Sequence, residues 1–203
     1  GTAMIFFATF IFSMFVFEDN KMLVVVNILL AFIGLFIAYK LFNHIRVRFE
    51  IWQDPWTDYH VKGYQIIQGL FALSSGGFFG SGIGLGRPNL VPVSTSDFIL
   101  PAVVEEMGVF MGISIVLLFI ILIYKGIKIS LVNTDDFHSS LAMGVSIIFA
   151  SQALVMFAGV LKLIPLTGIT TPFMSYGGSS TLASFILLAV LQYCSKEKKV
   201  KYE

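Results

Sequence analysis

The chain has little charge, one cysteine and three histidines, and each shortage excludes a class of protein. Asp, Glu, Lys and Arg make up 12% of its 203 residues, whereas soluble domains have about 25%. The single cysteine, Cys194, excludes an internal disulfide and a cysteine metal site. The histidines have no neighbouring ligands at metal spacing, and no Ser-His-Asp set is evident. A net charge of +1, without a basic patch interleaved with aromatics, gives no sign of a nucleic-acid partner.

Hydrophobic residues dominate instead, at 57% of the chain and a mean hydropathy of +0.88. A helix needs about 20 apolar residues to cross the hydrocarbon core of a bilayer. The sequence has six apolar segments near this length, so we predict an all-α fold, a polytopic transmembrane helix bundle of six membrane helices forming one domain over residues 1–203. The predicted spans are Thr2–Phe17, Met22–Phe42, Gly63–Phe79, Phe98–Tyr124, Ser139–Val160 and Ser179–Tyr193. Since Gly1 is not an initiator residue, we expect a piece of a longer protein or a processed product.

The distribution of Lys and Arg predicts the orientation, because cytoplasmic loops carry an excess of these residues. With six spans and a cytoplasmic C-terminus, ten of them fall inside, namely Lys40, Arg46, Arg48, Lys62, Lys125, Lys128, Lys196, Lys198, Lys199 and Lys201. Three fall outside, namely Lys21, Arg87 and Lys162. We therefore predict a multi-pass protein with a cytoplasmic C-terminus and outer loops at Glu18–Lys21, Gly80–Ser96 and Leu161–Gly178.

The second and third outer loops are long and rich in Gly and Pro, yet still partly apolar. Irregular backbone at membrane depth occurs where it is buried in protein or lines a wet cavity. We therefore predict that both loops are partly re-entrant and form the floor and wall of an outward-facing cleft.

Three carboxylates cluster near the start of the fourth predicted span: Asp97, Glu105 and Glu106. Charge near a bilayer core is costly, so these groups need partners, water or a function. Asp97 fits either a capping box with Ser94 as N-cap or a reactive role. Helical spacing makes Glu105 the better neighbour for Asp97. The adjacent glutamates could bind a divalent cation or hold a proton, or simply hydrogen-bond to polar residues of other helices.

Two groups of glycines stand out. Gly76, Gly80 and Gly84 recur every four residues, which is the spacing for close helix approach. Gly177 and Gly178 precede Ser179 at the start of the last span, where backbone N–H groups could receive an anion such as pyrophosphate. Helix initiation alone explains this second group equally well.

Six ordered motifs give the chain a resemblance to a known family. They are Gly63–Gln68, Ser75–Gly82, Ser96–Ile99, Glu105–Gly108, Leu163–Ile169 and Pro172–Ser180. Together they resemble the SEDS family (shape, elongation, division and sporulation), which includes RodA, FtsW and SpoVE. Family members usually have ten membrane helices, and this chain resembles helices five to ten. It departs from the family at Ser96, where Thr is usual, and at Phe157–Gly159, where Asn-Ile-Gly is frequent.

The resemblance implies a peptidoglycan glycosyltransferase that polymerises lipid II at the outer face of the bacterial cytoplasmic membrane, for cell division or elongation. The family's essential aspartate matches Asp97, which would act as general base on the attacking sugar hydroxyl. Undecaprenyl pyrophosphate would leave, and a divalent cation (Mg or Mn) would help by neutralising its charge. The implied partner is a class B penicillin-binding protein, a transpeptidase. The absent first half would normally supply part of the cleft, so activity is expected of the full-length protein rather than of this part.

The expected site combines these residues with the two outer loops. The predicted substrate-binding residues are Arg87, Lys162, Ser175, Gly177, Gly178 and Ser179. The predicted supporting polar residues are Glu105, Glu106, Gln65 and Gln68. No metal ligands are assigned.

Two other functions compete with the enzyme. An amphipathic cleft in a helix bundle would also suit a transporter (flippase) for lipid-linked precursors, or the chain could be a non-catalytic scaffold for the transpeptidase. A transporter needs a polar path to the inner face, and the second, fourth and sixth spans offer little beyond Asn27, Ser114 and Gln192. This favours the enzyme.

Overall fold

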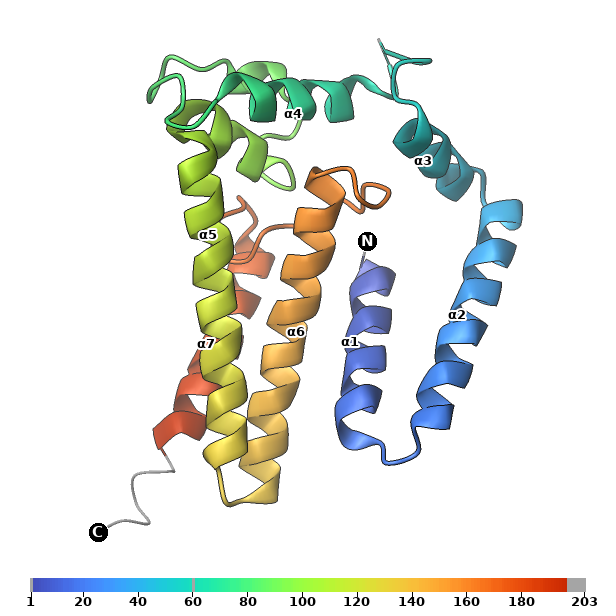
Figure 1. Cartoon of the computed structure of the whole chain (residues 1–203), viewed down its shortest axis with the longest axis vertical. Coiled ribbons are helices and arrows are strands. Elements are labelled where there is room, and N and C mark those ends of the chain that lie inside the picture. Colours follow the sequence, from blue (N-terminus) through green and yellow to red (C-terminus); the bar gives the residue numbers. More distant parts are fainter. Residues whose placement is uncertain (1, 60, 197–203) are drawn as a thin grey trace.

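The computed structural model describes residues 2–59 and 61–196, and this part of the chain is helical without strands (Figure 1). The elements are α1 (Thr2–Phe17), α2 (Lys21–Leu41), α3 (Asn43–Gln53), α4 (Tyr64–Ser75), the short 3-10 helix η1 (Pro88–Leu90), α5 (Ile99–Val132), α6 (Asp136–Val160) and α7 (Gly178–Lys196). Four of these helices, α2, α5, α6 and α7, are long and apolar enough to cross a membrane, and α1 is a shorter apolar helix. The predicted class, a multi-pass helical membrane bundle, is confirmed.

The core of the bundle lies where α6 packs against α5 and α7. One cluster, near the ends of α5 and α6 that face α4, contains Leu100, Val104, Phe119 and Met156. A second cluster joins α6 to α7 through Phe149, Leu191 and Cys194. Gly126 allows α5 to approach α6 closely, because a Cβ at this position would lie 2.1 Å from the hydroxyl oxygen of Ser146 in α6.

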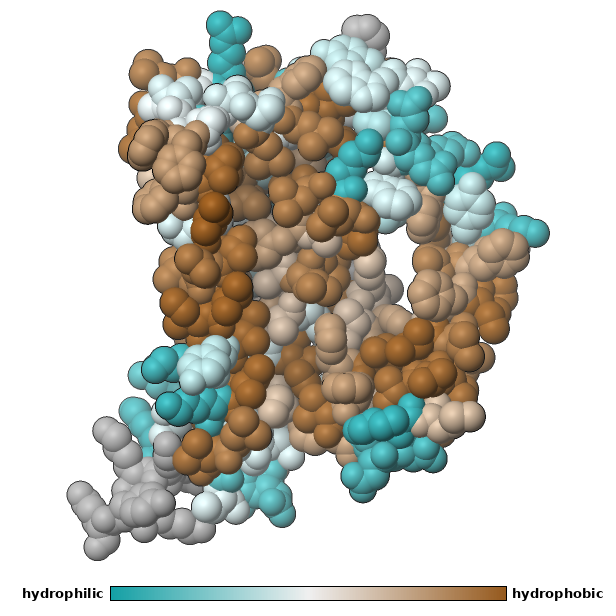
Figure 2. All heavy atoms as spheres, in the orientation of Figure 1, coloured by the Kyte–Doolittle hydropathy of each residue, from teal (hydrophilic) through white to brown (hydrophobic). Residues whose placement is uncertain are grey.

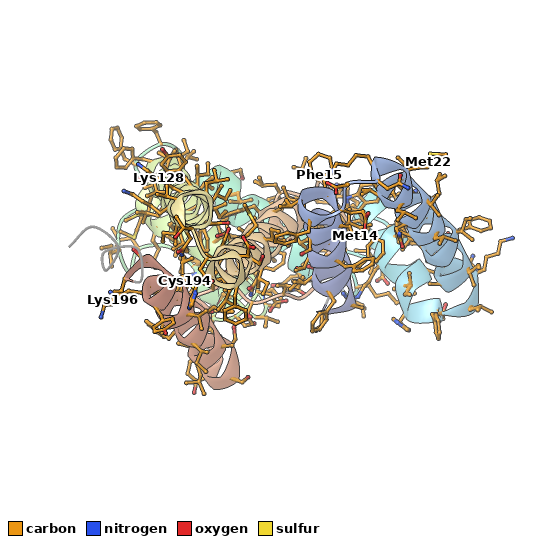
Figure 3. All side chains as sticks on the ribbon, turned by 90° about the horizontal axis from the view of Figure 1, so that it is seen from below. Met14, Phe15, Met22, Lys128, Cys194 and Lys196 are labelled. Carbon is orange, nitrogen blue, oxygen red and sulfur yellow. The ribbon has the colours of Figure 1, made fainter. Side chains whose placement is uncertain are left out.

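Helices α1 and α2 lie at one side of this core, as Figure 3 shows in a view from below Figure 1. α1 packs against α6, and α2 contacts α1 and α3. α1 has no buried residue and α2 has one, Val24. The surface over the long helices is hydrophobic, with hydrophilic residues gathered near the two ends (Figure 2). This pattern fits a bundle surrounded by lipid.

The third predicted span, Gly63–Phe79, is wrong. α4 has 12 residues, which corresponds to about 18 Å at ~1.5 Å per residue. It crosses the end of the bundle instead of running along it (Figure 1). Glycines explain why the helix stops, since Gly77 and Gly80 have φ values of +54° and +84°, which end a right-handed helix. The predicted count of six spans is therefore too high.

Without that span, the side of the membrane predicted for several loops is also wrong. The segment from α3 to the start of α5 lies at one end of the bundle, and the turn between α1 and α2 lies at the other (Figure 1). Among described residues, the end with Asp97 now holds Lys40, Arg46, Arg48, Lys62, Arg87 and Lys162. The opposite end holds Lys21, Lys125, Lys128 and Lys196, while Lys198, Lys199 and Lys201 lie outside the described residues. The charge bias that supported the orientation is lost, so the side of the C-terminus stays a prediction.

The third outer loop descends into the bundle. Gln152 of α6 donates a hydrogen bond to the Thr170 carbonyl at 3.1 Å. The ring of Phe173 stacks on Phe149 with centroids 5.7 Å apart. Phe149 lies 11 residues before the end of α6, so the loop reaches about 16 Å down that helix.

The second outer loop is joined to α5 through backbone atoms. Gly108 breaks the helix, with φ +82° and ψ +169°. Ordinary helical bonding would pair the N–H groups of Val109 and Phe110 with the carbonyls of residues 105 and 106. Here those two N–H groups donate to the carbonyls of Gly77 and Phe78, and the carbonyls of residues 105 and 106 accept from the N–H groups of residues 81 and 82. Segment 77–82 thus replaces the missing turn of α5.

Close contact at this junction requires glycine. A Cβ at Gly76 would lie 2.0 Å from the Val104 carbonyl oxygen, and one at Gly80 would lie 2.1 Å from that of Glu106. The predicted close approach is therefore confirmed for these two glycines. It does not extend to Gly84, which has nothing within 4 Å of an added Cβ.

Candidate functional site

Asp97 lies in a turn just before α5. The helix begins at Ile99 with Phe98 as an N-cap that makes no side-chain capping bond. Pro101 is in the first turn, where a missing N–H is tolerated. The predicted capping box of Ser94 and Asp97 is therefore wrong. The Asp97 carboxylate accepts a hydrogen bond from the Ser96 hydroxyl and is half-buried.

The next residue, Phe98, anchors this turn. Its ring is 1% exposed and packs in a small core with Ala72 and Val91. Gly69 of α4 faces the ring, and a Cβ there would lie 2.4 Å from the Phe98 Cε1 atom. The absence of a side chain at Gly69 therefore fixes how deeply Phe98 sits, and with it the position of Asp97.

A second anchor comes from the third outer loop. The Ser175 hydroxyl donates to the Ser96 carbonyl at 2.5 Å and accepts from the Thr171 N–H at 2.6 Å. The Tyr176 N–H donates to the Thr95 carbonyl at 2.7 Å. The second and third outer loops therefore contact each other, through Thr95 and Ser96 of the second loop and Ser175 and Tyr176 of the third.

Asp97 opens into a small polar pocket of about 130 Å³ at the end of the bundle. The pocket is formed by α3, the start of α4 and the third outer loop, and its lining residues are Arg48, Ile51, Lys62, Gln65, Ile66, Asp97, Leu166 and Gly168. The Arg48 guanidinium donates to the Leu166 carbonyl at 2.8 Å. The Trp52 indole N–H donates to the Lys162 carbonyl at 2.9 Å. Two cationic side chains and one carboxylate therefore share this pocket.

The turn between α3 and α4 brings the two cations together. Asp54 accepts hydrogen bonds from the Thr57 hydroxyl at 2.7 Å and from the Trp56 N–H at 3.0 Å. These bonds, first that of Thr57, lower the pKa of Asp54. The turn reverses the chain after α3, so that Lys62 returns to the pocket reached by Arg48.

The two predicted cationic contacts lie elsewhere. Arg87 is exposed, and its backbone N–H donates to a carboxylate oxygen of Glu105 at 2.9 Å. The Lys162 carbonyl accepts from Trp52, but Lys162 does not line the pocket with Asp97. Their binding role stays a prediction, and the structure offers Arg48 and Lys62 as the cations beside Asp97.

Sequence reasoning missed Arg48 and Lys62 because the assumed third span placed both on the cytoplasmic side. The signal that could have found them is the weakness of that span, which is rich in Gly, Ser and Gln. Treating residues 63–79 as a surface segment would have brought both cations to the end with Asp97.

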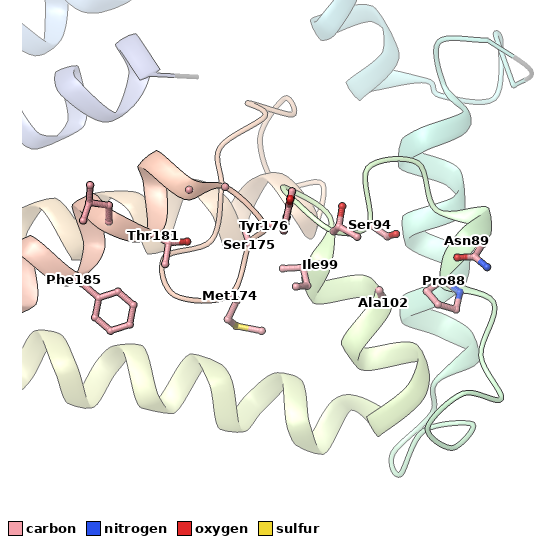
Figure 4. Close-up of a pocket in the computed structure, with 14 residues that line it drawn as sticks. Pro88, Asn89, Ser94, Ile99, Ala102, Met174, Ser175, Tyr176, Thr181 and Phe185 are labelled. Carbon is pink, nitrogen blue, oxygen red and sulfur yellow. The ribbon is translucent and has the colours of Figure 1, made fainter.

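Three of the other predicted substrate-binding residues line a second, larger hollow of about 940 Å³ between α5 and α7 (Figure 4). These are Ser175, Gly177 and Gly178. Ser179 is exposed in the first turn of α7 and is not part of this lining. Asp97 does not line this hollow, so the structure does not gather these residues around its carboxylate.

The predicted supporting polar residues do not lie together around Asp97 either. Gln65 lines the pocket with Asp97, and Gln68 is half-buried outside it. Glu105 is directed to the second outer loop rather than to Asp97. One of its oxygens accepts from Arg87, and the other is buried without a partner among the described residues. The Glu106 side chain lies against Gly86.

The carboxylates therefore do not form a metal cage. No group of three or more His, Cys, Asp or Glu residues in the described ranges could hold a metal ion. Mg²⁺ is often bound by one or two carboxylates with substrate phosphates completing its shell. Asp97 fits that limited role, as the one protein carboxylate that lines the pocket.

This geometry defines a polytopic helical membrane protein with a charged pocket at one end of its bundle. The chain belongs to the FtsW/RodA/SpoVE family of cell cycle proteins, whose sequence profile matches residues 1–200.

Curated relatives agree with this assignment. The peptidoglycan glycosyltransferase RodA of Mycobacterium leprae is 41% identical over 191 residues, covering 94% of this chain and 41% of the relative. Stage V sporulation protein E of Bacillus subtilis is 38% identical over 174 residues, covering 83% of this chain and 48% of the relative. The probable peptidoglycan glycosyltransferase FtsW of Bacillus subtilis is 38% identical over 161 residues, covering 75% and 40%. The chain thus spans less than half the length of these proteins.

A solved structure shares the fold. It is described as "Structural coordination of polymerization and crosslinking by a peptidoglycan synthase complex" and superposes with a TM-score of 0.74. The match covers 98% of this chain and 56% of the other, at 24% sequence identity.

Proposed function

We propose that this chain forms part of a peptidoglycan glycosyltransferase that polymerises lipid II, with Asp97 as the general base. The observation that carries the proposal is the pocket that Asp97 shares with Arg48 and Lys62. Transfer of a sugar from a lipid pyrophosphate needs a base for the attacking hydroxyl and positive charge for the departing pyrophosphate, and this pocket supplies both.

In the proposed reaction, the Asp97 carboxylate takes the proton of the attacking sugar hydroxyl while that oxygen bonds to the anomeric carbon of the second lipid-linked sugar. The bond from this carbon to the pyrophosphate oxygen breaks, and undecaprenyl pyrophosphate leaves. Positioned cations stabilise such developing charge, and Arg48 offers a bidentate fork. A divalent cation, Mg or Mn, would be held by Asp97 and the pyrophosphate, and when bound it supplies further neutralising charge.

The charge pattern of the pocket suits catalysis better than transport. Below it, the interface of α5 and α6 is filled by apolar side chains, including Leu100, Val104 and Phe119. A flippase needs a polar route past this level. We further propose that the protein resides in the bacterial cytoplasmic membrane, with Asp97 outside and the C-terminus inside. A class B penicillin-binding protein is the proposed partner, in keeping with the polymerising and crosslinking complex described for the solved structure.

The test is strand formation from purified lipid II by the full-length protein. Asp97→Asn keeps the size of the side chain and its capacity to accept the Ser96 hydrogen bond, but removes the basic carboxylate. We expect turnover to fall by about 10²- to 10⁴-fold with the melting temperature nearly unchanged. Asp136→Asn, an exposed acid at the other end of the bundle, is the matched control. Turnover by Asp97→Asn close to that of Asp136→Asn would remove Asp97 from the mechanism, whereas no turnover by the parent protein would favour the scaffold.

A further inference from the structure

Four aromatic side chains gather where the turn after α3 meets α4. The rings of Trp56 and Tyr59 are nearly parallel, at an interplanar angle of 8° with centroids 6.3 Å apart. The ring of Phe71 in α4 lies 6.0 Å from that of Trp56, and Tyr64 meets Tyr59 edge-on at 6.3 Å. Trp56 and Phe71 are 55% and 46% exposed. We call these four residues the aromatic platform, which lies at the same end of the bundle as Asp97 (Figure 1).

Backbone packing fixes the turn that carries Trp56 and Tyr59. The Pro55 side chain is fully buried. A Cβ at Gly63 would lie 1.9 Å from the Pro55 carbonyl oxygen, so the two backbones are in contact. The Gly63 N–H also donates to the Asp58 carbonyl at 2.9 Å. The exposed rings are therefore held in place before a ligand arrives, which lowers the entropy cost of binding one.

Helix α4 connects the aromatic platform to the pocket of Asp97. Gln65 lines that pocket, and Tyr64 directly before it belongs to the platform. At 3.6 residues per turn, Tyr64, Gln68 and Phe71 fall within about 60° of one another around the helix. This side is opposite to the residues that α4 buries, which are Ile66, Ile67, Gly69 and Ala72. A molecule that extends from the pocket over α4 therefore contacts the platform.

The composition of this surface fits a carbohydrate. The C–H groups of a sugar ring pack against the face of an aromatic ring, while its hydroxyl and amide groups hydrogen-bond to polar groups nearby. Gln68 adds an amide on the side of α4 that carries Tyr64 and Phe71. The indole of Trp56 and the phenol of Tyr59 combine an apolar ring with a polar group, which suits a ligand that is itself apolar in part and polar in part.

The size of the Asp97 pocket requires a polymer to continue outside it. Its volume of about 130 Å³ is below the ~300–1,000 Å³ of sites that enclose a drug-sized ligand. A glycan of several sugar rings is at least as large as such a ligand. We propose that the aromatic platform binds the growing glycan strand where it leaves this pocket. The inference rests on the proposed function, and it adds the place where the product of that reaction lies.

The experiment uses the full-length protein in nanodiscs and a photoreactive hexasaccharide of N-acetylglucosamine. After irradiation, mass spectrometry should find the label on residues 56–59 and 64–71. Unlabelled hexasaccharide should reduce this labelling several-fold, and a larger share of phosphatidylglycerol in the nanodisc should not. No labelling of these residues would overturn the proposal. Labelling that phosphatidylglycerol removes equally would also overturn it, and would assign the platform to lipid head groups, where Trp and Tyr are frequent.

Variants of the platform test it by a second route. Trp56→Ala should weaken hexasaccharide binding by about two- to tenfold, the effect of losing one aromatic contact, and should shorten the strands made from lipid II. Phe71→Ala, at an exposed position of α4, should do the same. Trp56→Phe keeps an aromatic ring and should recover most of both properties. Phe137→Ala, 69% exposed at the other end of the bundle, is the matched control.

Two results would contradict the proposal from these variants. One is hexasaccharide binding and strand lengths in both Trp56→Ala and Phe71→Ala that equal those of Phe137→Ala. The other is a Trp56→Phe protein that is as impaired as Trp56→Ala, because the ring itself would then not be what binds the sugar.

Failure of this inference can be told apart from failure of the proposed function. Asp97→Asn should stop turnover while residues 56–59 and 64–71 are still labelled, since hexasaccharide binding needs no catalysis. Labelling of a parent protein that has no turnover would contradict the proposed function and, with it, the growing strand as the occupant. If turnover is normal but these residues are not labelled, the proposed function stands and the glycan platform is wrong.

Discussion

Substituting alanine for Gly69 tests how the fold positions Asp97. A Cβ at this position would lie 2.4 Å from Cε1 and 2.8 Å from Cδ1 of Phe98, whereas ordinary contact begins at 3.4 Å. The ring is buried at 1% exposure and cannot turn toward solvent. It must therefore move by about 1 Å, and Asp97, the preceding residue, must move with it.

The expected effects on stability and on turnover differ greatly. Overpacking costs about 1–3 kcal/mol, and replacing glycine in a helix returns about 0.5–1 kcal/mol. The net loss of about 0–2.5 kcal/mol should lower the melting temperature by only a few degrees. A displacement of about 1 Å at a reacting group can cost about 100-fold in rate. Gly69→Ala should thus lose most of its activity while it stays folded.

The assay measures lipid II turnover and the melting temperature of the full-length protein. Gly144→Ala in α6 is the matched control, because nothing lies within 4 Å of a Cβ added there. Combining Gly69→Ala with Phe98→Leu should recover part of the turnover, since the smaller side chain removes the clash. If Gly69→Ala turns over within about twofold of Gly144→Ala, the Phe98 anchor does not set the position of the base.

Three further predictions concern α5 and the charged residues. Gly108→Ala should destabilise the protein by about 3 kcal/mol or more, because φ is +82° and a Cβ would lie 2.2 Å from the Phe78 carbonyl oxygen; an unchanged melting temperature would contradict this. Arg48→Lys should lower kcat/KM for lipid II by about tenfold through loss of the planar fork. Arg46→Lys, whose parent side chain pairs with exposed Glu50, is its control and should stay near the parent value. Arg87→Ala should leave the KM within about twofold, and a large increase would restore Arg87 to the binding site.

The sequence was sufficient to predict the long helices that run along the bundle. It was insufficient to predict the structure of the segment between α2 and α5. Long apolar runs identify α2, α5, α6 and α7 because their signal is local. α4 fails this test, because a short helix with buried Ile66 and Ile67 has a similar composition whether it crosses a bilayer or lies over the end of a bundle. One wrong span inverted the sides of Arg48 and Lys62.

The site was predicted in part for the same reason. Asp97 and its place before α5 follow from local motifs. Its neighbours come from contacts that span the sequence, such as that of Arg48 with Leu166, 118 residues later. Local pattern also left a capping box at Asp97 open as an alternative, because a Ser-x-x-Asp pattern cannot reveal that the helix begins at Ile99, after the buried Phe98.

The junction of segment 77–82 with α5 is made by main-chain hydrogen bonds, which bring two backbones close together. It therefore requires residues without a side chain at the points of contact. A scan of all substitutions across this region should therefore give an uneven map. Sharp intolerance is expected at Gly76, Gly80 and Gly108, where a Cβ would meet carbonyl groups. Between them, Phe79 is 82% exposed and should accept many replacements. Related proteins could thus keep this corner of the fold while the side chains on its outer face diverge freely.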